Sequence, residues 1–189
     1  MSSHHIVREK QEPALLVLGL DNFPEELLGQ LLEWSPTVIA TAQTAENLVS
    51  RGIKIDWIIT NGQDKVLQSD VKLMSCGDCN LSDAALEFLA DNEYSAVNII
   101  TDDLNLADYE PFANKIDLVI FNNDLKIYPI ASGFSKWKPA DELIEVLSPA
   151  KRFDFTGLEK IDHRHYKTTA DGFFALHFDE PFLFIAEQI

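Results

Sequence analysis

The chain has 189 residues, and its 31 acidic and 15 basic side chains give a formal net charge of −16 at pH 7. This charge disfavours nucleic acid and membrane surfaces as partners, because both anionic ligands attract clustered lysine and arginine. A hydrophobic fraction of 46% excludes a disordered chain, so we expect an acidic, soluble globular protein with one or two cores.

Residues 14–121 alternate short apolar runs with segments of helical spacing. Pro24 suits the first turn of a helix, and Asn80 or Ser82 can cap another. Strands that alternate with helices form right-handed crossovers and a mainly parallel sheet covered on both faces. We therefore predict a Rossmann-like α/β domain in residues 1–123, with strands at 15–19, 37–40, 56–60, 96–100 and 118–121 and helices at 24–34, 45–50 and about 80–91.

The pattern changes after Phe121, where turn residues precede a segment, 125–130, that alternates with a period near two. Three further apolar runs, separated by turn-rich segments, complete the chain at 142–147, 172–178 and 181–189. We predict a small antiparallel β-sandwich domain in residues 124–189, with the domain boundary near Asn123. Most of its ten aromatic side chains from Phe134 to Phe184 are expected in the core or at a dimer interface.

Two cysteines, Cys76 and Cys79, are too few for a disulfide framework, and the first residues show no signal-peptide apolar region. No apolar run has the length of a membrane-spanning helix, so we expect a cytoplasmic protein. The cysteines form a lone C-x-x-C, for which a redox or metal role stays open beside an ordinary loop. Residues 162–165, Asp-His-Arg-His, suit a metal or a phosphate, but an exposed turn is the simpler interpretation.

Ligands of open α/β sheets bind beyond the carboxyl ends of the strands, so the residues after each predicted strand are candidates for a site. Amide, hydroxyl and carboxylate side chains dominate there. Because loops and helix caps use the same residue types, a purely structural role remains the alternative at each position. The candidate segments are 41–44, 60–64, 80–83 and 101–109, the last of which contains Asp102.

The order of elements and three segments resemble the thiamine pyrophosphokinase family. The segments are 51–59, 146–149 (Val-Leu-Ser-Pro) and 155–158 (Phe-Thr-Gly-Leu). The resemblance covers nearly the whole chain and implies an α/β catalytic domain, a β-sandwich thiamine-binding domain and a homodimer with thiamine at the subunit interface. It also implies Mg²⁺-dependent transfer of a pyrophosphoryl group from ATP to thiamine, which yields AMP and thiamine diphosphate.

Most of the family's site motifs are altered here. Its Asp-Gly-Gly matches Ala42, Gln43 and Thr44, so a carboxylate is lost. Its Gly-Asp-Phe-Asp-Ser matches residues 60–64, which places Asn61 and Gln63 where two aspartates belong and adds Asp64.

The two later motifs keep one aspartate each. Asp-x-Thr-Asp matches residues 80–83, which retain Ser82 and Asp83, and Gly-Gly-Arg-x-Asp-His matches 104–109, which retain Asp108. An amide is a weaker ligand than a carboxylate for Mg²⁺, and the missing arginine removes a bidentate phosphate donor. Residues 73–114 contain nine acidic side chains and no Lys or Arg, so without a metal this segment repels ATP.

Three hypotheses follow. The leading one is a thiamine pyrophosphokinase-like protein with lost or strongly reduced kinase activity and a binding or regulatory role, holding a thiamine-like ligand or a nucleotide through Gln43, Thr44, Asn61, Gln63, Ser82 and Asp102. The second is an active Mg²⁺-dependent thiamine diphosphokinase with rearranged carboxylates. In this hypothesis Asp64, Asp83 and Asp108 hold the metal and act in catalysis. The third is an acidic protein-interaction module.

Overall fold

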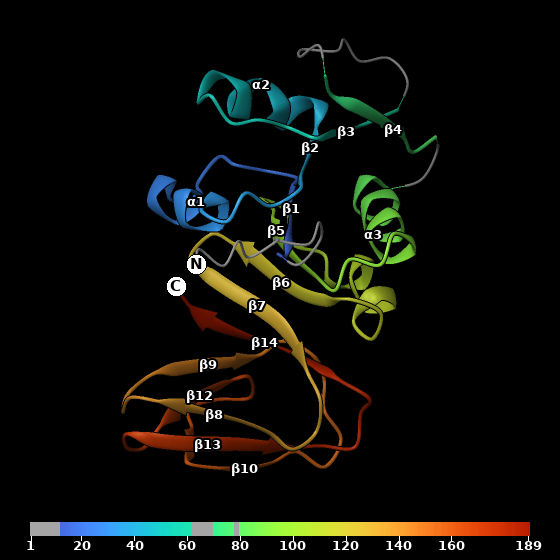
Figure 1. Cartoon of the computed structure of the whole chain (residues 1–189). Coiled ribbons are helices and arrows are strands. Elements are labelled where there is room, and N and C mark those ends of the chain that lie inside the picture. The colour runs from blue at the N-terminus through green and yellow to red at the C-terminus, as the bar shows by residue number, and fades with distance from the viewer. Residues whose placement is uncertain (1–11, 62–69, 78–79) are drawn as a thin grey trace, which may run out of the picture. The chain divides into compact units, whose positions relative to one another are not determined.

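The computed structural model describes residues 12–61, 70–77 and 80–189 (Figure 1). The chain divides into two compact units, residues 1–123 and 124–189. No helix in the described part of the chain combines the length and the apolar character needed to cross a membrane.

The strands of the first unit form a parallel sheet, as the sequence predicts. Their order is β6-β5-β1-β2-β3-β4. Because β1 has β2 on one side and β5 on the other, the strand order reverses between β1 and β5. The strands are β1 (Ala14–Val17), β2 (Val38–Thr41), β3 (Trp57–Thr60), β4 (Lys72–Ser75), β5 (Ala96–Ile100) and β6 (Asp117–Asn122).

Helices cover both faces of this sheet (Figure 1). α1 (Glu25–Leu32) and α2 (Ala42–Ser50) bury Leu28 and Leu48 in one core with Leu15 and Val17 of β1. On the other face, α3 (Leu81–Asp91) packs against β3, with its Phe88 ring 4.6 Å from that of Trp57. Two short 3₁₀ helices, η1 (Leu106–Asp108) and η2 (Glu110–Phe112), follow β5.

Helix α2 begins at Ala42, three residues earlier than predicted. The Thr41 hydroxyl accepts a hydrogen bond from the Thr44 backbone N–H, and the Thr41 backbone N–H donates to the Thr44 hydroxyl. This reciprocal capping box satisfies donors at the start of the helix. The predicted strand-end loop at 41–44 is therefore the first turn of a helix.

The second unit consists of two antiparallel sheets that share one core. Ile144, Tyr166 and Ile185 come from one sheet, and Phe174 and Leu176 come from the other. The first sheet contains, in spatial order, β7 (Leu125–Ile130), β14 (Leu183–Gln188), β9 (Leu143–Val146), β12 (His165–Thr168) and β11 (Leu158–Lys160). The second contains β10 (Asp154–Thr156), β13 (Gly172–His177) and β8 (Phe134–Lys138).

A buried ion cluster ties these two sheets together. The carboxylate of Glu187 on β14 is 4% exposed and lies 2.6 Å from the Lys136 ammonium and 3.3 Å from that of Lys138, both on β8. The Tyr128 hydroxyl on β7 donates to the same carboxylate at 2.7 Å. Burial raises the pKa of Glu187, but hydrogen bonds from Lys136 and Tyr128 and the charges of both lysines outweigh it and hold the pKa below its usual value.

Two aromatic side chains depart from the expected core. Trp137 and Phe173 oppose each other across β8 and β13 and are 52% and 71% exposed. Tyr166, Phe174, Phe178 and Phe184 are buried as predicted. The exposed pair is an apolar patch on the outer face of the three-stranded sheet.

Candidate functional site

The point where strand order reverses brings together the residues that follow β1 and β5. The Asp21 backbone N–H, after β1, donates to both carboxylate oxygens of Asp102, after β5, at 3.2 Å each. Gly19 makes this contact possible, because a β-carbon at that position would overlap the backbone nitrogen and carboxylate of Asp102. The Asp102 carboxylate thus lies over the end of β1, at the place where such sheets bind ligands.

The turn that carries Asp102 is fixed by its neighbours. The side-chain amide of Asn122, at the end of β6, donates to the carbonyl oxygens of Thr101 and Asp102 at 3.0 Å each. The Thr101 hydroxyl donates to the carbonyl oxygen of Asp103 at 2.8 Å. The turn is therefore a rigid part of the sheet edge.

Two amide groups occupy the carboxylate of Asp108. The side-chain amide of Asn80, the N-cap of α3, donates to one Asp108 oxygen at 3.0 Å, and that of Asn105 donates to the other at 2.9 Å. Asn80 also accepts a 3.4 Å hydrogen bond from the Ser82 backbone N–H through its own side-chain oxygen. The start of α3 and the η1 segment are thereby joined through one carboxylate.

Asp83 lies within electrostatic range of Asp108. Burial raises the pKa of Asp83, and the charges of Asp108 and then Glu87 add to the rise. Nearby, Tyr109 is 2% exposed, and burial together with the same two aspartates raises the pKa of its phenol to about 12. The structure therefore places two of the three predicted catalytic aspartates in one electrostatic cluster.

This cluster gives a testable order of effects on the pKa of Asp83. We expect Asp108→Asn to lower it more than Glu87→Gln does, because the charge of Asp108 raises the pKa of Asp83 more than that of Glu87. Carboxyl-carbon NMR titration measures both shifts. The control is Asp103→Asn, which changes an exposed aspartate of the same edge. An unchanged Asp83 pKa in Asp108→Asn would contradict the arrangement.

Ser82 is the predicted ligand residue with an unsatisfied side chain. It is 3% exposed, and its hydroxyl has no hydrogen-bond partner among the residues that the structure describes. It occupies the second position of α3, between Asn80 and Asp83. A buried hydroxyl without a partner costs stability, so its retention at this edge fits a use other than packing.

The remaining predicted ligand residues are placed differently. Thr44 is buried, and its hydroxyl donates to the carbonyl oxygen of Val17 at 2.9 Å in addition to its role in the cap, so it serves the fold. Gln43 and Asn61 are exposed at the ends of β2 and β3. Gln63 and Asp64 lie outside the described residues, as does Cys79.

Within the described ranges, no group of three or more His, Cys, Asp or Glu side chains is placed to hold a metal ion. The predicted set of Asp64, Asp83 and Asp108 depends on Asp64, which is not among them, so it stays a prediction. Of the other two, Asp108 accepts one hydrogen bond from an amide N–H group on each of its oxygens, and these amides supply no ligand atom to a cation.

Sequence reasoning missed the partners that organise this edge. The sequence places Asn80 and Asn105 in candidate segments but does not predict that both contact Asp108, and Asp21 is in none of these segments. Asn80 and Asp108 are 28 positions apart, so only the packing of α3 against the segment after β5 reveals their contact. The one available signal was the density of Asn and Asp after the strands.

The segment 162–165 is a turn between β11 and β12, as its simpler interpretation predicts. The Asp162 carboxylate accepts hydrogen bonds from the backbone N–H groups of Arg164 and His165, both at 2.8 Å. These bonds, with one from the His165 ring, lower the pKa of Asp162. Asp162 therefore shapes the turn.

The chain matches no family model and no curated protein. Its fold does resemble solved structures of thiamine pyrophosphokinases. That from Bacillus subtilis has a TM-score of 0.71 at 13% identity over 93% of this chain and 99% of its own. Those from Candida albicans and yeast each give 0.69, at 7% and 9% identity, over 94% and 96% of this chain and 90% and 88% of their own. The chain thus has a thiamine pyrophosphokinase-like fold.

Proposed function

We propose that this chain is a thiamine pyrophosphokinase-like protein with lost or strongly reduced pyrophosphoryl transfer and a binding or regulatory role. The observation that carries the proposal is the hydrogen bonding of the Asp108 carboxylate. Both of its oxygens accept hydrogen bonds from the side-chain amides of Asn80 and Asn105. These neutral donors stabilise the Asp108 carboxylate without a cation, and Asn80 stands where the resembled family has an aspartate, so the edge has one carboxylate fewer for Mg²⁺.

The charge of the same edge supports this proposal. Asp21, Asp83, Asp102, Asp103 and Asp108 all follow strands or open helices there, and the sequence from 73 to 114 has no Lys or Arg. The phosphates of a nucleotide need positive charge or backbone N–H groups close to them. At the reversal point the Asp21 N–H is already taken by the Asp102 carboxylate.

A ligand for this edge would be a small, uncharged or cationic heterocycle such as thiamine. Its hydrogen-bonding groups would face exposed Gln43 and Asn61, and in the described part of the chain no partner competes for the hydroxyl of Ser82. A cation is favoured by the surrounding carboxylates, whereas ATP is disfavoured by them. The charge of the ligand therefore distinguishes a thiamine-like compound, which this edge would bind, from a nucleotide, which it would not.

The second candidate is an active Mg²⁺-dependent diphosphokinase that uses Asp64, Asp83 and Asp108. The observation in its favour is the pKa of Asp83, which burial and then the charges of Asp108 and Glu87 raise, because a divalent cation would relieve this like-charge repulsion. The described residues alone do not supply a site for a resident Mg²⁺, since no three of their His, Cys, Asp or Glu side chains are placed together to hold it. This candidate therefore requires Asp64.

Calorimetric titration of the full chain tests the proposal. We expect saturable binding of thiamine without Mg²⁺ and no saturable binding of ATP with Mg²⁺ at millimolar concentrations. Asp108→Asn and Asp83→Asn remove negative charge and should weaken thiamine binding by up to about tenfold each. The matched control is Glu93→Gln, an exposed acid that follows the end of α3.

Two outcomes would contradict the proposal. Tight Mg²⁺-dependent ATP binding that disappears in Asp83→Asn and Asp108→Asn would favour the active enzyme. If neither thiamine nor ATP binds, the acidic interaction module becomes the better description.

We also propose that the chain is a homodimer and that the second unit contributes to its interface. The exposed pair of Trp137 and Phe173 supports this, because two adjacent aromatic side chains on a sheet face are usually covered by a partner. Sedimentation equilibrium of the full chain tests the assembly, and a monomer at micromolar concentration would contradict it.

A further inference from the structure

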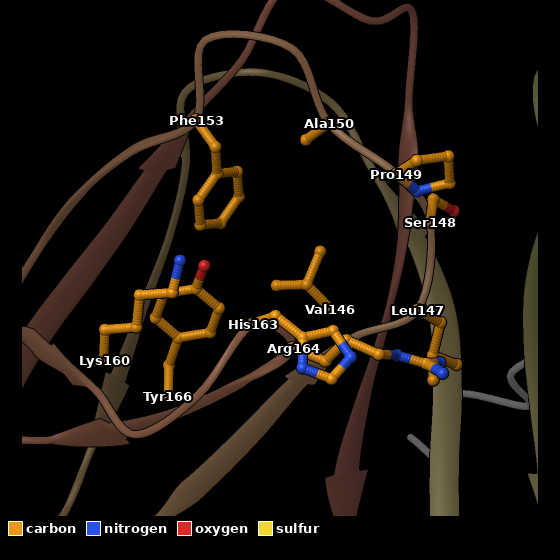
Figure 2. A pocket seen from close by; sticks show the side chains of 10 residues that line it. All are labelled: Val146, Leu147, Ser148, Pro149, Ala150, Phe153, Lys160, His163, Arg164 and Tyr166. Atoms are coloured by element: carbon orange, nitrogen blue, oxygen red, sulfur yellow. The ribbon is translucent and has the colours of Figure 1, made fainter.

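A cavity of about 380 Å³ lies within the second unit, where every residue is described (Figure 2). It is bounded by the segment after β9 on one side and by the hairpin of β11 and β12 on the other. Pairing of β12 with β9 holds these two segments together. The volume suits one small molecule with a single ring.

The charged residues that line this cavity are basic, although the chain as a whole is acidic. Three of its ten lining residues are basic, Lys160, His163 and Arg164, and none is acidic. The whole sequence, by contrast, has 31 acidic and 15 basic residues. A cluster of positive side chains around a concave surface concentrates anions even on an acidic protein.

Aromatic rings form the wall next to Lys160, across the cavity from Arg164 (Figure 2). The Phe153 and Tyr166 ring centroids are 5.3 Å apart, and both rings line the cavity. The Lys160 ammonium lies over the Tyr166 ring, 5.9 Å from its centroid. Figure 2 shows the Lys160 ammonium beside the Tyr166 hydroxyl, with both groups directed toward Phe153. A planar ring placed here would contact aromatic surface while its substituent met the ammonium group.

Several donors in the cavity remain available. Lys160 has no salt bridge within the second unit, and the Tyr166 hydroxyl has no hydrogen bond among the described residues although Tyr166 is 3% exposed.

Arg164 adds positive charge on the side of the cavity opposite Lys160 (Figure 2), although it is already paired. Its guanidinium lies 3.2 Å from the Glu145 carboxylate and keeps further N–H donors, because arginine carries five. The Glu145 contact fixes the guanidinium beside the cavity. His163 is exposed at the rim and can add charge when it is protonated.

We propose that this cavity binds a small aromatic anion, in which a planar ring carries a phosphate or carboxylate group. The ring packs against Phe153 and Tyr166, and the anion accepts hydrogen bonds from Lys160 and the Tyr166 hydroxyl. Thiamine, a cation, is excluded from this cavity by the same charges. The proposal is independent of the function assigned to the acidic sheet edge of the first unit.

Amide and side-chain NMR of the full chain tests the site with simple probes. Phenyl phosphate and benzoate each have an aromatic ring and an anionic group, whereas inorganic phosphate has only the anion and phenol only the ring. We expect phenyl phosphate or benzoate to shift the resonances of Lys160, Arg164 and Tyr166 and to bind at least about tenfold more tightly than either single-feature probe. Comparison of the two also distinguishes a phosphate from a carboxylate ligand.

Matched variants localise the binding. Lys160→Gln should weaken it about tenfold, and Tyr166→Phe should weaken it severalfold while preserving the ring packing. Lys126→Gln on β7, which removes a lysine that does not line the cavity, and Asp108→Asn in the first unit should leave it unchanged.

Three results would overturn the proposal. The first is no saturable shift at the cavity with either aromatic anion. The second is equal weakening in Lys160→Gln and Lys126→Gln, which would indicate attraction by net charge alone. The third is binding of thiamine at the same resonances with comparable affinity.

Discussion

Glu187→Ala is expected to lower the free energy of unfolding by about 3 kcal/mol. The substitution leaves Lys136, Lys138 and the Tyr128 hydroxyl without the carboxylate that they share between the two sheets of the second unit. Breaking a buried ion pair on one side is costly because the partner charges stay desolvated. The loss lies at the low end of the range because Lys136 is 36% exposed and can turn toward water. Urea unfolding monitored by tryptophan fluorescence measures it.

The stability that Glu187 contributes should depend on pH. The folded-state pKa of Glu187 lies below its ordinary value of 4.5, so its stabilising effect is complete above that value and declines as the pH falls below it. The difference in stability between wild type and Glu187→Ala should therefore be smaller at pH 3 than at pH 7. Glu142→Gln is the control, since Glu142 contacts the same Lys138 but is 41% exposed, and solvent screening limits its loss to under about 1 kcal/mol. Equal losses in the two variants would contradict the account.

Gly157→Ala should destabilise the second unit by about 3 kcal/mol. Gly157 has a φ of +73°, which an alanine adopts only with strain, and an added β-carbon would lie 2.7 Å from the Phe173 carbonyl oxygen and 3.0 Å from the Phe174 Cα. Because both atoms belong to the backbone of β13, the strand itself would have to move. The same urea unfolding experiment measures the effect.

A second glycine distinguishes the cost of a positive φ from the cost of steric overlap by the added β-carbon. Gly133 also has a positive φ, +88°, but an added β-carbon there meets no atom within 4 Å. Gly133→Ala should cost only the conformational part, about 1 kcal/mol. If the two alanine variants lost the same stability, the close approach of β13 to Gly157 would not be the cause.

The fold was largely predictable because hydrophobic periodicity marks its longer elements. The predicted strands at 96–100 and 125–130 have the bounds of β5 and β7. By contrast, β10 and β11 have three residues each, which is too short for any periodicity, and β4 is an edge strand with exposed side chains. The start of α2 was missed because Thr41 and Thr44 cap each other, a device that polarity alone does not distinguish from a loop.

The candidate site was predictable only in outline. Strand ends identified the segments that contain Asp83, Asp102 and Asp108, because the carboxyl ends of parallel strands share one edge. The contacts of Asp102 with Asp21 and of Asp108 with Asn80 join segments far apart in sequence, and no local pattern encodes them. The basic cavity of the second unit was hidden for the same reason, since the pairing of β12 with β9 assembles it.

The measurement that tests the central claim most directly is turnover. Purified full-length protein is incubated with ATP, Mg²⁺ and thiamine, and phosphorus NMR follows AMP and thiamine diphosphate, with a thiamine pyrophosphokinase as positive control. Because amides occupy Asp108 and carboxylates surround the sheet edge, we expect no product above the protein-free reaction. Formation of AMP and thiamine diphosphate in equal amounts, abolished by Asp83→Asn and by Asp108→Asn, would contradict it and establish an active diphosphokinase.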